Sequence, residues 1–562
     1  MMWRMRRRSR TICLSLAFIS IFLHLLLALV SLSTYQQPCD TPLPPRTHIL
    51  RDLARTNYTS AGIRSPAETP NDAMKRDSSY EEAKNETKGH MLTLSDKGLP
   101  VKGSKIDSVN MAGSSGRYGS RAKTLESDLL KLEALFDHPL YKILGPPIPQ
   151  EDWLLKVKPK VKASEKSSQM WVSASQEGYE DVQWNSSSSS HPPWLRFHLG
   201  ISRWQLYSHC DPNVEALTQQ LATQRVVSAV QKSGGTQLKL VMSFPDYGQA
   251  MFKPMKQERD EETNYNLYYF SDFERHNAEI AAFHLDRILG YRRIPPVVGR
   301  LVDVVKEIKD ITTDRKLAQT FFTSPVGNVC FYGQCSYYCS TEHAVCGRPR
   351  GLEASLAVML PDLSLASRRS WRSPWRRSYS RSKLAKWETE ADYCSTVKKT
   401  PPYDKGTRLV DFMDMVILDF LMSNMDRHHY ETFEKFGNDT FLLHLDNGRA
   451  FGRHSKDERS ILAPLEQCCR IRRSTWLRLR LLSLPQYRIS DVLRASLSRD
   501  TLHKIAPLLA EPHLAALDRR LKTVLETVSR CQKQHRGDGE EVIYNDMAYS
   551  KDMVEQPHTA FV

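Results

Sequence analysis

The sequence predicts an α+β fold in which a lobe with strands is followed by a mainly helical lobe. TQLKLVMSF and QAMFKP flank a PDYG turn and predict a β-hairpin, and the apolar periodicity of residues 272–289 predicts a helix that Gly290 ends. Residues 409–425 predict a second, strongly apolar helix, followed by a buried strand at 441–445 and further amphipathic helices. The short apolar segment 355–365, bounded by charge, is expected to connect the two lobes.

The N-terminus predicts a membrane signal. Five arginines precede an uncharged, mainly apolar run from Ile12 to Leu32, whose length of about 30 Å as a helix matches the hydrocarbon thickness of a bilayer. We expect residues 1–35 to form a cytoplasmic tip and a signal anchor; a long signal peptide cleaved near Ser31 or Ser33 is the alternative. The chain would then attach to the membrane through this anchor, with its remainder in the lumen. This placement argues against a nucleic-acid partner despite a net charge of +15.

Two polar regions flank the predicted folded part. Residues 36–190 are rich in Ser, Lys, Asp, Glu, Gly and Pro and predict a flexible lumenal stem. Within it, leucines at helical spacing predict a helix near 124–138 that packs on the folded domain or on a partner. Residues 536–562 predict a disordered tail.

Eight of the eleven cysteines fall between Cys330 and Cys531. In an oxidising compartment such a clustered, even set indicates four disulfides. The alternative is a zinc site formed by Cys330, Cys335, Cys339 and Cys346 with His343. Paired CxxC spacings, which are typical of such sites, are missing from this stretch.

Two aspartates in the stretch 425–452 have the layout of a phosphoryl-transfer site. Asp426 follows the apolar helix and Asp446 follows the predicted strand. Such a site needs one loop carboxylate to accept the proton of the attacking hydroxyl and a second to hold a divalent metal. Two unrelated turn aspartates would be the plain alternative.

Residues further upstream could complete that site. Lys253 ends the hairpin, with Lys256 as a rival, and Glu274 and Glu279 lie in the first two turns of the predicted helix. A strand lysine followed by a helix glutamate is the pairing that kinases use, although such a glutamate often only complements the helix dipole. Residues 367–387 interleave arginines and lysines with aromatic residues. In the lumen this segment would suit an acidic polypeptide or a glycan, and a solvated basic face is equally compatible.

Five stretches carry a resemblance: MDRHHYETF, HLDNGRAFG, ERHNAEIAAFHLDRIL, FYGQCSYYCSTEHAVCG and PLEQCCRIRRSTWLRL. Over about residues 195–535 the chain resembles the secretory-pathway kinases called family with sequence similarity 20. The CSYYCSTEHAVCG and WRRSY segments are more similar to its protein-kinase members than to its xylose-kinase members.

The resemblance implies an atypical two-lobed protein-kinase-like fold, with the N-lobe and its cysteine-rich insert at 191–355 and a disulfide-stabilised C-lobe at 356–535. It implies transfer of the γ-phosphate of ATP, with Mn²⁺ or Mg²⁺, to serine in Ser-x-Glu motifs of acidic secreted proteins. It also implies residence in the Golgi membrane and lumen, secretion after proteolytic release, and a homodimer or a heterodimer with a related pseudokinase.

The same resemblance implies roles for single residues. Asp426 would be the catalytic aspartate, Asp446 and Glu274 would bind the metal, and Lys253 would contact phosphate. The remaining nucleotide contacts would be Gln237, Ala357, Val358, Met359, Leu360 and Glu431. The implied disulfides are Cys330–Cys346, Cys335–Cys339, Cys394–Cys468 and Cys469–Cys531, which leaves Cys210 as a candidate free thiol.

Two other functions within the family stay open. A pseudokinase activator departs from the kinases at the position matched by Glu274, so the glutamate here argues against that function. A glycan xylose kinase shares the catalytic residues, and the stretches DERSILAPL and STW would suit it.

Overall fold

The computed structural model describes residues 115–143, 148, 152–155, 191–264, 266–380, 382–535 and 542–547. The predicted signal anchor and most of the predicted stem lie outside these residues. Within them, no helix combines the length and the hydropathy that crossing a bilayer requires. The described residues from 120 onward belong to one compact unit, and of a second unit, 41–119, the structure describes residues 115–119.

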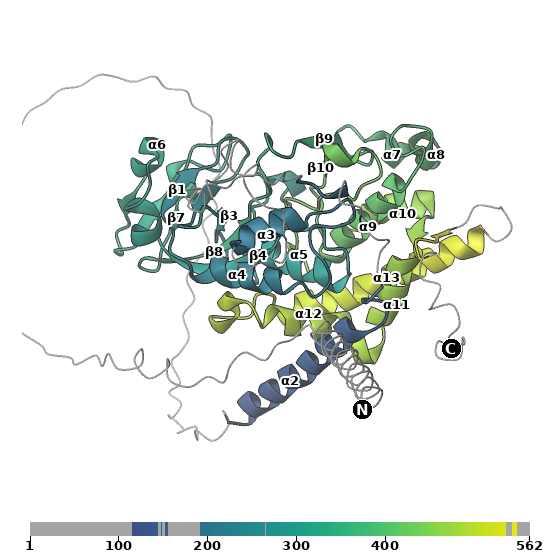
Figure 1. Cartoon of the computed structure of the whole chain (residues 1–562), viewed down its shortest axis with the longest axis horizontal. Helices are drawn as coiled ribbons and strands as arrows, with labels where there is room; N and C mark the ends of the chain where they lie inside the picture. Colours follow the sequence, from purple (N-terminus) through teal and green to yellow (C-terminus); the bar gives the residue numbers. More distant parts are fainter. Residues whose placement is uncertain are drawn as a thin grey trace, which may run out of the picture. The chain divides into compact units, whose positions relative to one another are not determined.

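The N-lobe is built on a five-stranded antiparallel sheet with the order β1-β2-β3-β8-β4 (Figure 1). Its strands are β1 (Ser228–Gln231), β2 (Leu240–Ser243), β3 (Gln249–Pro254), β8 (Gly351–Val358) and β4 (Val297–Asp303). Helices α3 (Pro193–Gly200), α4 (Pro212–Thr223) and α5 (His276–Ile288) accompany it, and α4 and α5 contact β4 and β8. The hairpin predicted around the PDYG turn is present as β2 and β3.

The insert between β4 and β8 forms its own small sheet. It begins with a π-helix (Val305–Lys309) and α6 (Arg315–Ala318). The antiparallel strands β5 (Phe322–Thr323), β6 (Val329–Phe331) and β7 (Val345–Cys346) follow. Cys330–Cys346 ties β6 to β7 and Cys335–Cys339 closes the loop between them. The zinc interpretation of these four cysteines is therefore wrong.

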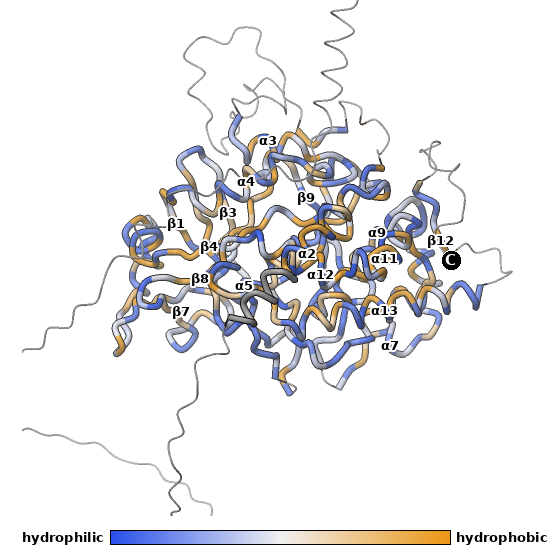
Figure 2. The backbone as a smooth tube through the Cα atoms, turned by 90° about the horizontal axis from the view of Figure 1, so that it is seen from below, coloured by the Kyte–Doolittle hydropathy of each residue, from blue (hydrophilic) through white to orange (hydrophobic). Residues whose placement is uncertain are grey.

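The C-lobe is mainly helical, as predicted. Its helices are α7 (Lys386–Thr389), α8 (Tyr393–Lys398), α9 (Arg408–Leu421), α10 (Ala463–Cys468), α11 (Arg473–Leu482), α12 (Ile489–Leu497) and α13 (Glu511–Gln534). Every residue of α9 except Leu409 is buried, whereas α13 alternates apolar and polar residues (Figure 2). Cys394–Cys468 joins α8 to α10, and Cys469–Cys531 joins the end of α10 to α13. All four predicted pairings are thus confirmed, and Cys210 is also disulfide-bonded rather than free.

Two short sheets complete the C-lobe. β9 (Arg368–Arg372) pairs antiparallel with β10 (His429–Phe433), and β11 (Ile471–Arg472) pairs parallel with β12 (Ile543–Tyr544). β12 lies in the predicted disordered tail, so that prediction is wrong for residues 542–547. Asp546 fixes this segment by accepting hydrogen bonds from the backbone N–H and the hydroxyl of Ser474.

The helix predicted in the stem is present as α2 (Ser115–Asp137). Leu132 and Leu135 are fully buried, and Asp128 and Lys131 form ion pairs of 2.6 Å with Arg494 and Asp491. Both partners belong to α12. Of the two predicted packing surfaces, the folded domain is therefore the one that α2 uses.

Candidate active site

Three carboxylates surround the ammonium group of Lys253, near the end of β3. Its Nζ lies 2.8 Å from Oε2 of Glu274 and 2.9 Å from Oδ1 of Asp446, and it also pairs with Glu279. The Lys253 side chain is almost completely buried. Burial alone would lower the pKa of Lys253, but the charges of Asp446, Glu274 and Glu279 together raise it well above its usual value.

Glu274 precedes α5 instead of lying within it, because the helix begins at His276 and not near residue 272. The N–H of Arg275 donates to the carbonyl of Gly448 over 2.6 Å, which places Glu274 beside the DNG segment. A Cβ at position 448 would lie 2.8 Å from the Cβ of Glu274, so glycine is required for this approach. Glu279 lies in the first turn of α5.

Asp446 follows a buried extended segment and has a left-handed backbone, with φ of 60°. Residues 441–445 are not a regular strand: the N–H groups of Leu443 and His444 donate to Glu431 and Arg293, which lie in different segments. The charges of Lys253 and then Lys239 hold the pKa of Asp446 well below its usual value. Its side chain is 56 % exposed.

One oxygen from each of Glu274, Glu279 and Asp446 lies within 4.8 Å of the others, a spacing that could hold a metal ion. Hard oxygen donors suit Mn²⁺ and Mg²⁺. The residues therefore fit the predicted metal, with Glu279 added to the predicted pair.

Asp426 lies in the loop after α9 and has its carboxylate bound by several groups. Arg449 donates to Oδ2, Tyr379 donates to Oδ1 over 3.4 Å, and Nδ1 of His428 lies 3.4 Å from Oδ1. The same nitrogen lies 2.7 Å from the backbone carbonyl oxygen of Asp426. A cavity of about 150 Å³ adjoins Asp426 and is also lined by Tyr268 and Arg449. A substrate hydroxyl entering this cavity would meet the carboxylate.

The loop between β1 and β2 carries Gly234 and Gly235, both with φ of 82°. Arg449 reaches this loop from the C-lobe, with Nη2 lying 3.5 Å from Oγ1 of Thr236. Gln237 is buried, its Oε1 accepts from Lys256, and its Nε2 is left without a partner among the described residues. A buried, unused donor fits the predicted role of Gln237 in binding a nucleotide.

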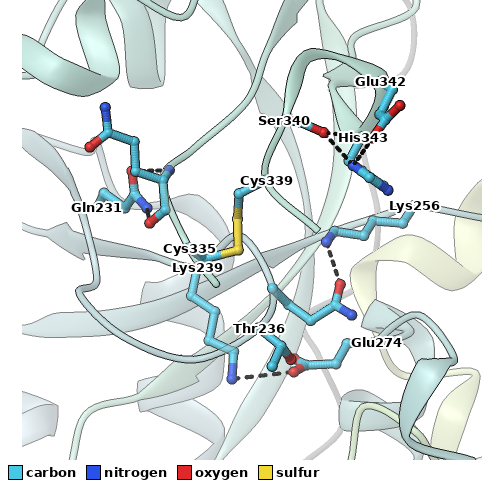
Figure 3. Close-up of a disulfide and its surroundings, with 12 residues drawn as sticks. Gln231, Thr236, Lys239, Lys256, Glu274, Cys335, Cys339, Ser340, Glu342 and His343 are labelled. Atoms are coloured by element: carbon cyan, nitrogen blue, oxygen red, sulfur yellow. Dashed lines mark hydrogen bonds and ion pairs between the residues drawn. A yellow bond between two sulfur atoms is a disulfide. The ribbon is translucent and has the colours of Figure 1, made fainter. Parts of the chain in front are cut away.

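The cysteine-rich insert supports that loop from outside. Cys335–Cys339 encloses residues 336–338, whose N–H groups at Ser336 and Tyr338 donate to the carbonyls of Gly235 and Thr236 over 3.2 and 3.1 Å. Figure 3 shows this disulfide above Thr236, with Lys239 reaching Glu274. The β1–β2 loop is thus held on both sides, by the insert and by Arg449.

The other predicted nucleotide contacts lie on neighbouring elements. Ala357 and Val358 end β8, where they pair with Met251 and Ala250 of β3. The N–H of Met359 donates to the carbonyl of Gln249, so this donor is not available for a nucleotide. Its carbonyl lies 2.8 Å from Nε2 of His198. Leu360 follows, partly buried.

Glu431 lies in β10 and accepts from Nε of Arg368 over 2.9 Å. The described contacts do not connect Glu431 with the cluster around Lys253.

Sequence reasoning left two residues of this site without a role. The sequence places Glu279 in the predicted helix. Its role could have been inferred from the expectation that Lys253, on a strand, pairs with a carboxylate of the helix. Arg449 follows the DNG segment, and its connection of Asp426 to Thr236 depends on three segments that are distant in sequence.

Comparisons with known proteins agree with this geometry. Residues 192–540 match the family model described as Golgi casein kinase, C-terminal, Fam20. The chain is 57% identical to the human extracellular serine/threonine protein kinase FAM20C over 411 residues, covering 73% of this chain and 70% of that protein. It is 47% identical to the mouse pseudokinase FAM20A, covering 76% and 83%.

A solved structure is similar as well. The crystal structure of the Golgi casein kinase with Mn/ADP bound matches with a TM-score of 0.59 and 42% identity, covering 62% of this chain and 82% of the other. Taken together with the paired cysteines and the cluster around Lys253, these matches show that the chain belongs to the Fam20 family.

Proposed function

We propose that this protein is a secretory-pathway serine kinase that transfers the γ-phosphate of ATP to Ser-x-Glu motifs of acidic secreted proteins. The observation that carries the proposal is the separation of two charged groups. The first group is Lys253 with its three carboxylate partners, Glu274, Glu279 and Asp446. The second is Asp426, which contacts Arg449, Tyr379 and His428. A kinase needs these two groups for the phosphates and for the attacking hydroxyl.

Each group has a role in this proposal. A bound Mn²⁺ or Mg²⁺ would neutralise charge on the phosphates. Glu274, Glu279 and Asp446 would hold that ion, and Lys253 would turn from its carboxylates toward a phosphate oxygen. Asp426 would orient the serine hydroxyl and take its proton. Arg449, which reaches both Asp426 and Thr236, would hold the β1–β2 loop against the C-lobe.

The retained carboxylate at Glu274 favours a kinase over a pseudokinase activator. Residence in the Golgi membrane and lumen, attachment through residues 12–32, release by proteolysis and pairing with itself or with a pseudokinase all belong to the proposal. They rest on the N-terminal sequence and on the family resemblance.

The test is to incubate the purified full-length chain with labelled ATP, Mn²⁺ and two acceptors in parallel, a Ser-x-Glu peptide and a xylose-containing linker sugar. Transfer to the peptide is expected, and a Gln replacement of the peptide Glu should remove it. Transfer to the sugar alone would replace the proposal by a glycan kinase. Transfer to neither acceptor would favour a pseudokinase.

A further inference from the structure

A cavity of about 690 Å³ opens in the C-lobe, lined by β9, the following loop, α7 and α8. Its lining contains no Asp or Glu. Five cationic side chains line it: Arg372, Arg376, Arg377, Lys383 and Lys386. Within the part of the chain that the structure describes, none of the five forms an ion pair. Nε of Arg376 is buried without a hydrogen-bond partner there, and burial lowers the pKa of Arg377. Glu458 and Glu388 act on Arg377 from outside the lining, but the lining itself carries only positive charges. Such a concave positive surface favours an anionic ligand.

The walls of the cavity are fixed by contacts on their outer side. The guanidinium groups of Arg369 and Arg408 lie 4.1 and 4.9 Å from the ring centre of Trp371. Nε1 of Trp387 donates to the carbonyl of Arg376 over 2.9 Å. Cys394–Cys468 secures α8, which forms the far wall. When a pocket is already formed before its ligand binds, little free energy is spent on ordering its side chains and loops.

The cavity also adjoins the catalytic loop. The N–H of Ser373 donates to the carbonyl of His428 over 2.9 Å. Tyr379, which reaches Asp426, follows Arg376 by three residues, so their Cα atoms are at most about 11 Å apart. An extended polypeptide with its serine at Asp426 could therefore place side chains a few residues away in the cavity.

We propose that this cavity is a docking site for a second acidic stretch of the protein substrate, separate from the Glu of the Ser-x-Glu motif. The inference rests on the proposed kinase function and specifies its substrate class. Carboxylates would pair with Arg376, Arg377, Lys383 and Lys386, and the exposed side chain of Leu384, which lines the same cavity, would offer apolar contact. Substrates with acidic runs beside the acceptor would be selected by this second contact.

The experiment compares two peptides that share one Ser-x-Glu core and differ in a tail of Glu or of Gln, placed on either side of the core. The variant is the double charge reversal Lys383→Glu/Lys386→Glu, at two exposed positions. The matched control is Lys316→Glu/Lys504→Glu, two exposed lysines remote from the cavity lining. KM for the Glu-tailed peptide should rise about tenfold in the variant with kcat unchanged, and KM for the Gln-tailed peptide should not move.

Equal KM shifts for both peptides, or no shift for the Glu-tailed one, would overturn the docking site. Binding of a fluorescein-labelled Glu-tailed peptide, measured by anisotropy, separates this failure from that of the proposed function. If the unmodified chain binds the peptide but transfers no phosphate, the kinase proposal falls while the docking site stands. If a sulfated oligosaccharide binds and the peptide does not, the cavity belongs to a glycan and the inference is wrong.

Discussion

The ammonium Nζ of Lys253 lies 2.9 Å from Oδ1 of Asp446, which joins a strand of the N-lobe directly to the DNG segment of the C-lobe. Replacing Lys253 by Met would leave three carboxylates together without their cation. We expect the free energy of unfolding to fall by about 3–5 kcal/mol and phosphate transfer to fall at least about 100-fold. Lys256→Met tests the rival lysine and should keep more of both stability and activity. Chemical denaturation and peptide phosphorylation measure the two effects, and a larger loss for Lys256→Met would reverse the assignment.

Asp446→Asn should abolish transfer and leave the fold intact. Asn tolerates the left-handed backbone at this position better than Ala does, so this replacement isolates the loss of the carboxylate charge. Mn²⁺-dependent activity should fall at least about 100-fold. The melting temperature should fall only slightly, because the Asp446 side chain is half exposed and Lys253 keeps its pairs with Glu274 and Glu279. Asp404→Asn, at an exposed position, is the control. Full activity of the Asp446 variant would remove this residue from the metal site.

The predicted contact of Glu431 with the nucleotide can be tested by substitution. If Glu431 contacts the nucleotide, Glu431→Gln should raise KM for ATP, by about three- to tenfold, without changing KM for the peptide. Arg368→Gln removes the same ion pair from the other side and serves as the matched variant. Identical effects of the two replacements would mean that Glu431 acts only through Arg368.

The two disulfides Cys335–Cys339 and Cys394–Cys468 should contribute differently. Their sequence separations are 4 and 74 residues, so loop-closure entropy predicts contributions of about 2 and 4.5 kcal/mol to stability. Replacing the first pair by Ser should mainly raise KM for ATP, because the insert holds the β1–β2 loop. Replacing the second pair should mainly lower the melting temperature. The reverse pattern would contradict the supporting role of the insert.

Stability should fall on acidification below pH 6.5, in part through His284. Burial lowers the pKa of His284 to about 3, and its Nδ1 lies 2.7 Å from Oγ of Ser496. Between pH 6.5 and about 3 the unfolded chain binds a proton at this residue that the folded chain does not bind. The free energy of unfolding therefore decreases by up to about 1.4 kcal/mol per pH unit in that window. His284→Asn should make this dependence shallower by about that amount, whereas an unchanged slope would show that other groups set it.

The fold and most of the site followed from local patterns in the sequence. The hairpin before Lys253 and the helix before Asp426 carry their own periodicity, and the cysteine pairs followed from the family resemblance. The sequence patterns did not predict the structure correctly where a segment forms hydrogen bonds with several distant parts of the chain. The apolar residues 441–445 predicted a strand, yet the N–H groups of Leu443 and His444 donate hydrogen bonds to the carbonyls of Glu431 and Arg293, in different parts of the chain. Arg449 had no local signal, since both of its partners come from elsewhere in the chain.

The packing of α2 restricts how the folded part could be separated from a membrane anchor. Leu132 and Leu135 belong to the core, and Asp128 and Lys131 are paired with α12. Loss of α2 from these positions would expose apolar surface on the C-lobe. A released form that keeps this apolar surface covered must therefore retain α2.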